Sequence, residues 1–154
     1  MLGAGVMGAQ IAAHLANAGL PVLLLDLTKD AADAGVARLK KLQPAPLFVP
    51  ENIALIRTGS FDDLSGLAQA DWIIEAIVER LDIKQQLLAR VDAVRAPHAI
   101  VSSNTSGIPL AAIAEGRSDG FRAHWIGTHF FNPPRYLRLV ELIATPDTDP
   151  AVAA

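Results

Sequence analysis

Three glycines near the start of the sequence have the spacing of a phosphate-binding turn. Residues 3–8 read Gly-Ala-Gly-Val-Met-Gly, and a helix-forming stretch with recurring apolar residues follows over 9–16. In such a turn the first glycine allows a tight bend, the second lets the backbone approach a pyrophosphate, and the third lets helix and strand pack closely. The N–H groups and the positive dipole end of the helix then hold the phosphates. The pattern therefore indicates a dinucleotide site at Gly3, Gly5 and Gly8.

An acid follows these glycines at the distance typical of a ribose ligand. Gly19 is expected to end the helix, and residues 21–26 form an apolar strand that closes on Asp26. A carboxylate at this strand end, about 20 residues beyond the glycines, meets the hydroxyls of the adenine ribose. It repels a 2′-phosphate, and no arginine follows directly, so the sequence favours NAD over NADP. The alternative is that Asp26 is a solvated strand-end residue or caps the next helix.

A histidine and a glutamate in the last third of the sequence have the chemistry of a general base and its partner. Oxidation of an alcohol by a nicotinamide needs a group that takes the hydroxyl proton, and the pKa of histidine suits that role. Only His129 lies near a strand end that should face the cofactor; the other histidines are His14, His98 and His124. Glu141 is the one acid in the apolar run 137–143, where a buried charge needs a partner. A carboxylate on the second imidazole nitrogen would fix the tautomer and stabilise the imidazolium.

Each of these residues also has a purely structural interpretation. A histidine in a strand is often a core residue, and the alternation along 137–143 equally allows Glu141 to face solvent at a sheet edge. Ser106 and Asn132 are candidates for binding the substrate oxygen or the nicotinamide. However, the sequences Ser-Asn-Thr-Ser and Asn-Pro-Pro that contain them are also turn-forming.

Composition excludes several classes of protein and site. The 154 residues are enough for one ordinary domain, and the formal charge of −3 argues against a nucleic-acid partner. The chain has no cysteine, which excludes disulfides and thiolate metal sites, and no metal is expected. No stretch is long and apolar enough for a membrane span, and no secretory signal is present. A soluble, cytoplasmic protein is therefore expected.

Strands and helices are expected to alternate along the chain. Apolar runs predict strands at 21–26, 52–58, 71–77, 99–102, 125–131 and 138–143, and helices at 9–16, 29–42, 80–95 and 109–114, with a turn and short helix over 61–70. This order predicts an α/β fold with a Rossmann-type, doubly wound, mainly parallel sheet. Only Met1 and Leu2 precede Gly3, so the first strand is expected to be truncated or missing and the chain to be a fragment.

Ligands of a doubly wound sheet bind beyond the carboxyl ends of its strands. This rule predicts that four segments share one rim of the sheet: the glycine-rich turn, residues 75–79, residues 103–106 and residues 129–132.

Five motifs spread over the sequence carry a resemblance to a known family. They are GAGVMGAQIA, the acid in LLLD, EAIVERLDIK, SSNTSGIP and GTHFFNPPRYLRLVELI, and together they cover essentially the whole chain. The sequence resembles the NAD-binding domain of 3-hydroxyacyl-CoA dehydrogenases. The resemblance implies such a domain over residues 1–145, followed over 146–154 by the start of a linker to an absent C-terminal helical domain. It further implies an acyl-CoA substrate and a homo-oligomeric parent protein.

By position, the resemblance assigns roles to individual residues. His129 becomes the catalytic base and Glu141 its partner, while Ser106 contacts the hydroxyl or keto oxygen and the cofactor, and Asn132 lies by the nicotinamide and substrate. The remaining implied cofactor contacts are Gly3, Gly5, Val6, Met7, Gly8, Asp26, Glu79 and Lys84.

The implied reaction is the oxidation of an L-3-hydroxyacyl-CoA to the 3-ketoacyl-CoA in fatty-acid beta-oxidation, with NAD⁺ taking hydride from C3. Two alternatives remain open. One is a dehydrogenase of small 3-hydroxy acids on the same fold, which would use a lysine base. The other is a non-catalytic nucleotide-binding module.

Overall fold

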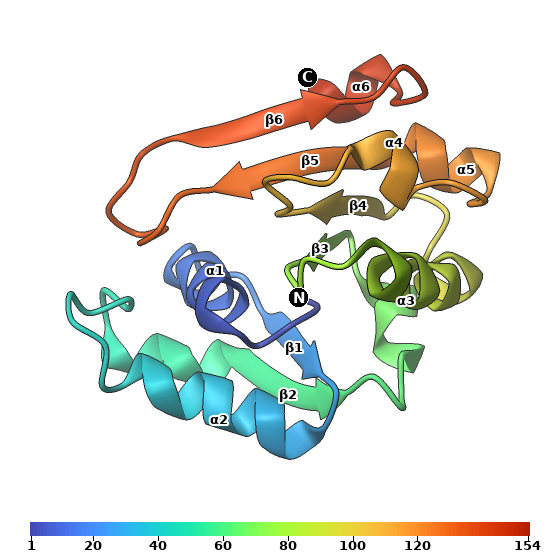
Figure 1. Ribbon diagram of the computed structural model, residues 1–154. Coiled ribbons are helices and arrows are strands. Elements are labelled where there is room, and N and C mark those ends of the chain that lie inside the picture. The colour runs from blue at the N-terminus through green and yellow to red at the C-terminus, as the bar shows by residue number, and fades with distance from the viewer. The chain divides into compact units, whose positions relative to one another are not determined.

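The computed structural model describes residues 1–154, in which helices and strands alternate as the sequence predicts (Figure 1). The chain divides into two compact units. The first comprises Met1–Asp63 and Phe130–Leu139, and the second comprises Leu64–His129 and Val140–Ala154. None of the helices has the length and apolar character needed to cross a membrane.

The first unit is built on two parallel strands. Strand β1 (Val22–Asp26) pairs in parallel with β2 (Ile56–Ser60). The helices α1 (Val6–Asn17) and α2 (Lys29–Leu39) pack against these strands, and the 3-10 helix η1 (Pro50–Leu55) leads into β2. The apolar face that the sequence predicts for the first helix is buried in α1, through Ile11, Ala12 and Ala16.

The residues before the glycine-rich loop lie beside β1. Leu2 forms a parallel bridge with Leu25, the Leu25 N–H donates to the Met1 carbonyl at 2.9 Å, and the Gly3 N–H donates to the Leu25 carbonyl at 2.8 Å. Met1 and Leu2 are both buried. Residues 1–3 thus pair with β1 as a short parallel bridge, at the position where the sequence predicts the first strand.

The second unit contains a four-stranded sheet in the order β3-β4-β5-β6. The strands β3 (Trp72–Glu75), β4 (Ile100–Ser103) and β5 (Trp125–Phe130) pair in parallel. Edge strand β6 (Val140–Ala144) lies beside β5, and its arrow points the opposite way in Figure 1. The sheet is therefore mainly parallel, as predicted.

Helices connect these strands and complete the core of the second unit. Helix α3 (Leu81–Val94) is the crossover between β3 and β4 and buries Leu87, Leu88 and Val91. The shorter helices are η2 (Ser65–Gln69), α4 (Leu110–Ile113), α5 (Asp119–Ala123) and α6 (Pro150–Ala153). Trp125 on β5 is fully buried and stacks on Phe121 of α5, with ring centroids 5.4 Å apart.

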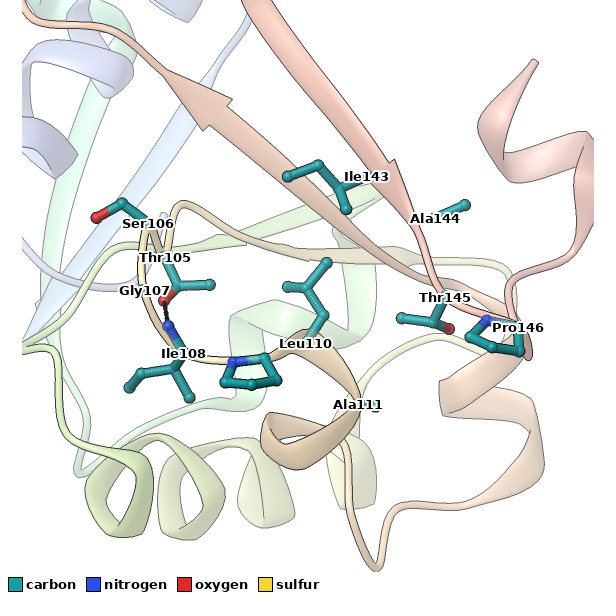
Figure 2. A pocket seen from close by; sticks show the side chains of 11 residues that line it. Thr105, Ser106, Gly107, Ile108, Leu110, Ala111, Ile143, Ala144, Thr145 and Pro146 are labelled. Atoms are coloured by element: carbon teal, nitrogen blue, oxygen red, sulfur yellow. Dashed lines mark hydrogen bonds between the residues drawn. The ribbon is translucent and has the colours of Figure 1, made fainter.

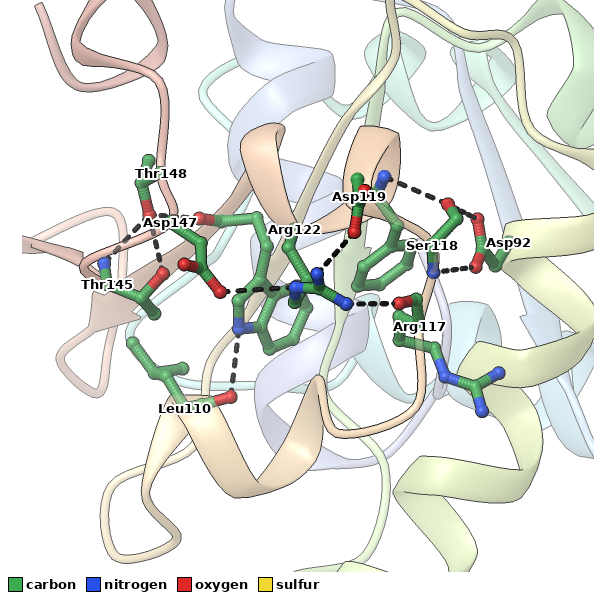
Figure 3. Close-up of polar contacts among 11 residues, drawn as sticks. Asp92, Leu110, Arg117, Ser118, Asp119, Arg122, Thr145, Asp147 and Thr148 are labelled. Atoms are coloured by element: carbon green, nitrogen blue, oxygen red, sulfur yellow. Dashed lines mark hydrogen bonds and ion pairs between the residues drawn. The ribbon is translucent and has the colours of Figure 1, made fainter.

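Polar contacts tie the turn after β6 to β5 and α5 (Figure 3). The Thr148 hydroxyl donates to the Trp125 carbonyl at 2.7 Å, and Arg122 Nε donates to Asp147 at 3.1 Å. The Trp125 indole N–H donates to the Leu110 carbonyl at 3.0 Å. Residues 145–149, which overlap the start of the linker predicted over 146–154, therefore form a turn that is held by β5 and α5.

Several elements differ from the sequence prediction. The strand predicted over 52–58 begins only at Ile56, because Pro50 opens a 3-10 helix instead. Helix α2 ends at Leu39, three residues before the predicted end. Helix α5 was not predicted; its one local signal is Ser118, whose hydroxyl accepts the Phe121 N–H at 3.1 Å as an N-cap.

Candidate cofactor and acid–base sites

The glycine-rich loop joins the bridge at residues 1–3 to α1 and requires glycine at two positions. Gly3 has a φ of 97°, which L side chains rarely adopt. A Cβ at Gly8 would lie 1.9 Å from the Gly3 carbonyl oxygen, so the first turn of α1 packs directly on the loop. Gly5 differs, because a Cβ added there would meet nothing within 4 Å. The loop is therefore tightly packed at Gly8 and open at Gly5.

The amino end of α1 is suited to an anion. Gly5 is the N-cap, no side chain caps the helix, and the first turn contains no acid. The first N–H groups of a helix have no partner within it, and its dipole places positive charge at that end. A pyrophosphate fits such an end, where the backbone N–H groups of Gly5, Val6 and Met7 lie.

Asp26 lies at the carboxyl end of β1 and holds the glycine-rich loop. Its Oδ2 accepts the Ala4 N–H at 2.6 Å, and its Oδ1 accepts the Leu27 N–H at 2.7 Å. An ionised carboxylate has about four acceptor positions, so Asp26 retains acceptors for ribose hydroxyls. The alternative role as a helix cap is wrong, because Thr28 caps α2 by accepting the Ala31 N–H at 3.1 Å.

Arg38 is a loop-supporting residue that the sequence does not reveal. Its Nη2 donates to the Ala4 carbonyl at 2.6 Å, while the N–H of the same residue, Ala4, donates to Asp26. A cation near the end of a helix usually stabilises the helix dipole and improves solubility. An arginine at this position therefore does not indicate a contact with the glycine-rich loop.

In the second unit, Glu75 and Lys84 form a buried ion pair. Lys84 Nζ lies 2.6 Å from Glu75 Oε1, and the two side chains are 1% and 0% exposed. Lys84 Nζ also lies 3.2 Å from Glu79 Oε2. Lys84, which the resemblance assigns to cofactor binding, is thus enclosed by two carboxylates. Its direct contact with the cofactor stays a prediction.

Glu79 connects this ion pair to the loop that carries Ser106. Its Oε1 accepts hydrogen bonds from the Thr105 hydroxyl and, at 3.2 Å each, from the Ser106 and Gly107 N–H groups. Burial by itself raises the pKa of Glu79, but the bonds from Thr105, Gly107 and Lys84 together bring that pKa below its ordinary value. Glu79 is therefore held as a carboxylate that organises the loop.

The acid–base pair that the sequence predicts has hydrogen-bonding geometry. His129 Nδ1, near the end of β5, lies 2.8 Å from Glu141 Oε2 on β6. A carboxylate only accepts, so Nδ1 carries the proton and the lone pair of the neutral imidazole is on Nε2. The His129 side chain is 21% exposed and that of Glu141 is 49% exposed. Glu141 is therefore not buried, and it pairs with His129 while facing solvent from an edge strand.

Asn132 belongs to the first unit and is held by α1. Its Oδ1 accepts a hydrogen bond from Gln10 Nε2 at 3.2 Å, which directs the amide nitrogen to other acceptors. Of the remaining histidines, His98 lies 3.4 Å from Asp71 and His124 Nδ1 lies 2.9 Å from the Gly120 carbonyl.

A cavity of about 440 Å³ lies beside the Ser106 loop (Figure 2). Its walls come from the segment that leads into α4 and from the end of β6, and they are mostly apolar. The side chains that line it include Thr105, Ser106, Ile108, Leu110 and Ile143.

The structure thus gathers the predicted residues into three groups. The glycine-rich loop with Asp26 forms one, Glu79, Lys84 and Ser106 form a second, and His129 with Glu141 forms a third. The sequence profile of the NAD-binding domain of 3-hydroxyacyl-CoA dehydrogenase matches residues 1–154. The chain belongs to this family. NAD is accordingly its cofactor, and the open glycine-rich loop and the carboxylate of Asp26 fit that dinucleotide.

Curated relatives agree with this assignment. The chain is 50% identical to a probable 3-hydroxyacyl-CoA dehydrogenase of Deinococcus radiodurans, in a match that covers 99% of this chain and 46% of the relative. It is 48% identical to a protein of the same description from Bacillus subtilis, with 99% and 22% covered. A putative fatty acid oxidation complex trifunctional enzyme of Rickettsia felis is 40% identical, with 93% and 21% covered. The chain thus spans less than half the length of each of these relatives.

Solved structures have the same fold. The 3-hydroxybutyryl-CoA dehydrogenase of Escherichia coli K12 superimposes with a TM-score of 0.85 at 33% identity, over 99% of this chain and 33% of that one. The (S)-3-hydroxybutyryl-CoA dehydrogenase PaaH1 of Ralstonia eutropha superimposes with a TM-score of 0.83 at 33% identity, over 99% and 55%.

Proposed function

We propose that this chain is the NAD-binding and acid–base part of an enzyme that oxidises L-3-hydroxyacyl-CoA to 3-ketoacyl-CoA. The observation that carries the proposal is the 2.8 Å contact between His129 Nδ1 and Glu141 Oε2. A base held in one tautomer by a carboxylate is what abstraction of a hydroxyl proton requires, whereas binding a nucleotide does not. The names of the relatives support the choice of substrate.

In the proposed reaction, His129 Nε2 takes the proton from the hydroxyl on C3 of the substrate. The C3–O bond becomes a carbonyl as the hydrogen on C3 leaves with its electron pair. NAD⁺, when bound, supplies the acceptor for that hydride. Glu141 accepts a hydrogen bond from the Nδ1–H group throughout and stabilises the imidazolium that forms. Ser106 and Asn132 donate hydrogen bonds to the oxygen on C3.

The cofactor contacts are divided between loop backbone and side chains. The loop from Gly3 to Gly8 and the amino end of α1 bind the pyrophosphate, and Asp26 accepts hydrogen bonds from the hydroxyls of the adenine ribose. A 2′-phosphate on that ribose would bring two negative charges together. The site therefore prefers NAD to NADP.

The proposed wider role is supported by the names of the relatives and not by the geometry of the site. The name of the trifunctional relative from Rickettsia felis supports a role in fatty-acid beta-oxidation. A C-terminal helical domain completes the acyl-CoA site in the longer parent protein, which acts as a homo-oligomer in the cytoplasm. The 154 residues alone bind NAD and turn over substrate poorly.

A chimera tests this proposal directly. The chain replaces the matching region of the Deinococcus radiodurans relative, to which it is 50% identical. NAD⁺-dependent oxidation of L-3-hydroxybutyryl-CoA is measured beside the D isomer and beside free 3-hydroxybutyrate. The proposal predicts turnover of the L-thioester alone. Faster turnover of the free acid would favour a dehydrogenase of small hydroxy acids, and a folded chimera that binds NADH without turnover of any substrate would favour a binding module.

A further inference from the structure

A closed ring of polar contacts underlies the loop that carries Ser106. It joins the end of β3 to the end of β4 by way of α3, and every contact in it lies within the second unit. We call it the carboxylate ring, and its members are Glu75, Lys84, Glu79, Thr105 and Ser103.

The ring closes through five successive contacts. Glu75 Oε1 pairs with Lys84 Nζ at 2.6 Å, and the same ammonium pairs with Glu79 Oε2 at 3.2 Å. Glu79 Oε1 accepts from the Thr105 hydroxyl, and the Thr105 N–H donates to Ser103 Oγ at 3.1 Å. The Ser103 hydroxyl returns to Glu75 Oε2 at 2.6 Å. Both carboxylates of the ring are thus bound through both of their oxygens.

The ring carries one more negative charge than positive charge in a largely buried place. Glu75, Lys84 and Ser103 are fully or almost fully buried, and Thr105 is buried as well. A buried carboxylate is costly unless it accepts several hydrogen bonds. Hydrogen bonds from backbone N–H groups stabilise the additional negative charge. The Ile77 N–H donates to Glu75, and the Ser106 and Gly107 N–H groups donate to Glu79. The loop backbone therefore supplies part of what makes the ring stable.

We infer that the carboxylate ring is a positioning device for Ser106. Glu75 and Lys84 fix the position of Glu79, and Glu79 holds the backbone N–H groups of Ser106 and Gly107. The exposed Ser106 hydroxyl is thereby presented to the ligand in one orientation. Lys84 and Thr105 act on this loop as positioning residues, through their contacts with Glu79. The role of Ser106 in binding the substrate rests on the proposed function, whereas the positioning of its loop by Glu79 does not.

Thr105 is the residue at which the inference is most cleanly tested. Its hydroxyl donates to Glu79 and also accepts the Ile108 N–H at 3.2 Å, so it links the ring to both sides of Ser106. Thr105→Val keeps the shape and removes the hydroxyl, while Thr105→Ser keeps the hydroxyl. Glu115 is exposed in the same unit, and Glu115→Gln is the control for loss of a carboxylate.

The first experiment follows the amide protons of Ser106 and Gly107 by NMR as the pH of the 154-residue chain is lowered. The inference predicts that both follow one titration with a midpoint below that of an ordinary glutamate, and that Glu79→Gln abolishes it. Thr105→Val raises the midpoint because the charged form loses a donor, whereas Thr105→Ser and Glu115→Gln leave it unchanged. Amide shifts that do not depend on Glu79, or a midpoint unaffected by Thr105→Val, would overturn the inference.

The second experiment measures catalysis in the chimera described above. Thr105→Val is expected to lower kcat about tenfold or more through misplacement of Ser106, and Thr105→Ser to restore it. Added to Ser106→Ala, Thr105→Val is expected to cost nothing further, because it acts through that hydroxyl. Additive losses would contradict positioning. A chimera with no activity would count against the proposed function, and the NMR titration would still decide the inference.

Discussion

The imidazole of His129 and the carboxylate of Glu141 are 2.8 Å apart, Nδ1 to Oε2, across the boundary between β5 and the edge strand β6. Both belong to the second unit, and neighbouring strands of one sheet bring them together. The pair therefore depends on the register of an edge strand, which presents Glu141 toward β5 although the strand itself is exposed.

Replacement of the carboxylate tests what the pair does for the base. Glu141→Gln retains the shape but offers His129 a neutral partner that also donates, so the tautomer is no longer fixed and the imidazolium loses its counter-charge. We expect kcat of the chimera to fall by about 10²–10⁴-fold, with little change in NADH affinity. Glu115→Gln, at an exposed position in the same unit, is the control and should leave kcat unchanged. Near-normal kcat in Glu141→Gln would show that the pair has no catalytic role.

The glycine-rich loop predicts opposite outcomes for two alanine substitutions. Gly8→Ala places a Cβ 1.9 Å from a backbone oxygen, so we expect a destabilised chain with a lower Tm. Gly5→Ala meets nothing within 4 Å and should leave the Tm unchanged, yet weaken NADH binding because the new methyl lies where the pyrophosphate approaches. Thermal unfolding and NADH fluorescence titration measure both properties. Normal NADH affinity in Gly5→Ala would place the pyrophosphate elsewhere.

Asp26 should set the preference for NADH over NADPH. Asp26→Asn keeps the size of the side chain but removes the charge, so NADH should lose about 1.5–3 kcal/mol of binding free energy. NADPH, freed from charge repulsion, should bind better. Asp30→Asn is the matched control, because Asp30 is exposed in the first turn of α2. An unchanged ratio of the two dissociation constants in Asp26→Asn would refute the assignment.

The burial of His14 on α1 should make the free energy of unfolding depend on pH. Burial lowers the pKa of His14 below its ordinary value of 6.5, and its Nδ1 is buried without a hydrogen-bond partner. The unfolded chain therefore binds this proton at a higher pH than the folded chain does. The free energy of unfolding must then fall as the pH drops below about 6.5.

Urea unfolding between pH 7 and pH 5 measures this contribution. His14→Gln should lose less stability over that range than the natural sequence does. His98→Gln, whose histidine side chain is 69% exposed, should follow the natural sequence. If the free energy of unfolding changed equally with pH in the natural sequence and in His14→Gln, His14 would have the same pKa in the folded and unfolded chains, and the prediction would be wrong.

The parts of the site that the sequence predicts are those with a local signature. The spacing of Gly3, Gly5 and Gly8 and the apolar strand before Asp26 are patterns within one βα unit, and the structure has that loop and that strand. The contact between Glu141 and His129 was predicted from an acid in an apolar run. The exposure of Glu141 agrees with the alternative that this residue faces solvent from an edge strand, and not with the burial that the apolar run suggests.

The parts that the sequence does not predict are contacts between common residue types far apart along the chain. Arg38 binds the Ala4 carbonyl 34 residues away, and Ser103 binds Glu75 28 residues away. An arginine on a helix or a serine at the end of a strand gives no indication in the sequence of such a partner. These contacts follow from the packing of α2 on the loop and from the parallel register of β3 and β4.

The most direct test of the account is the effect of His129→Gln on the chimera. Two quantities are measured for each protein: kcat for NAD⁺-dependent oxidation of L-3-hydroxybutyryl-CoA, and the dissociation constant of NADH. If His129 is the base, kcat falls by about 10²–10⁴-fold while NADH affinity stays within about twofold of its starting value. A variant that keeps its kcat would contradict the account, because some other group would then take the proton from the substrate.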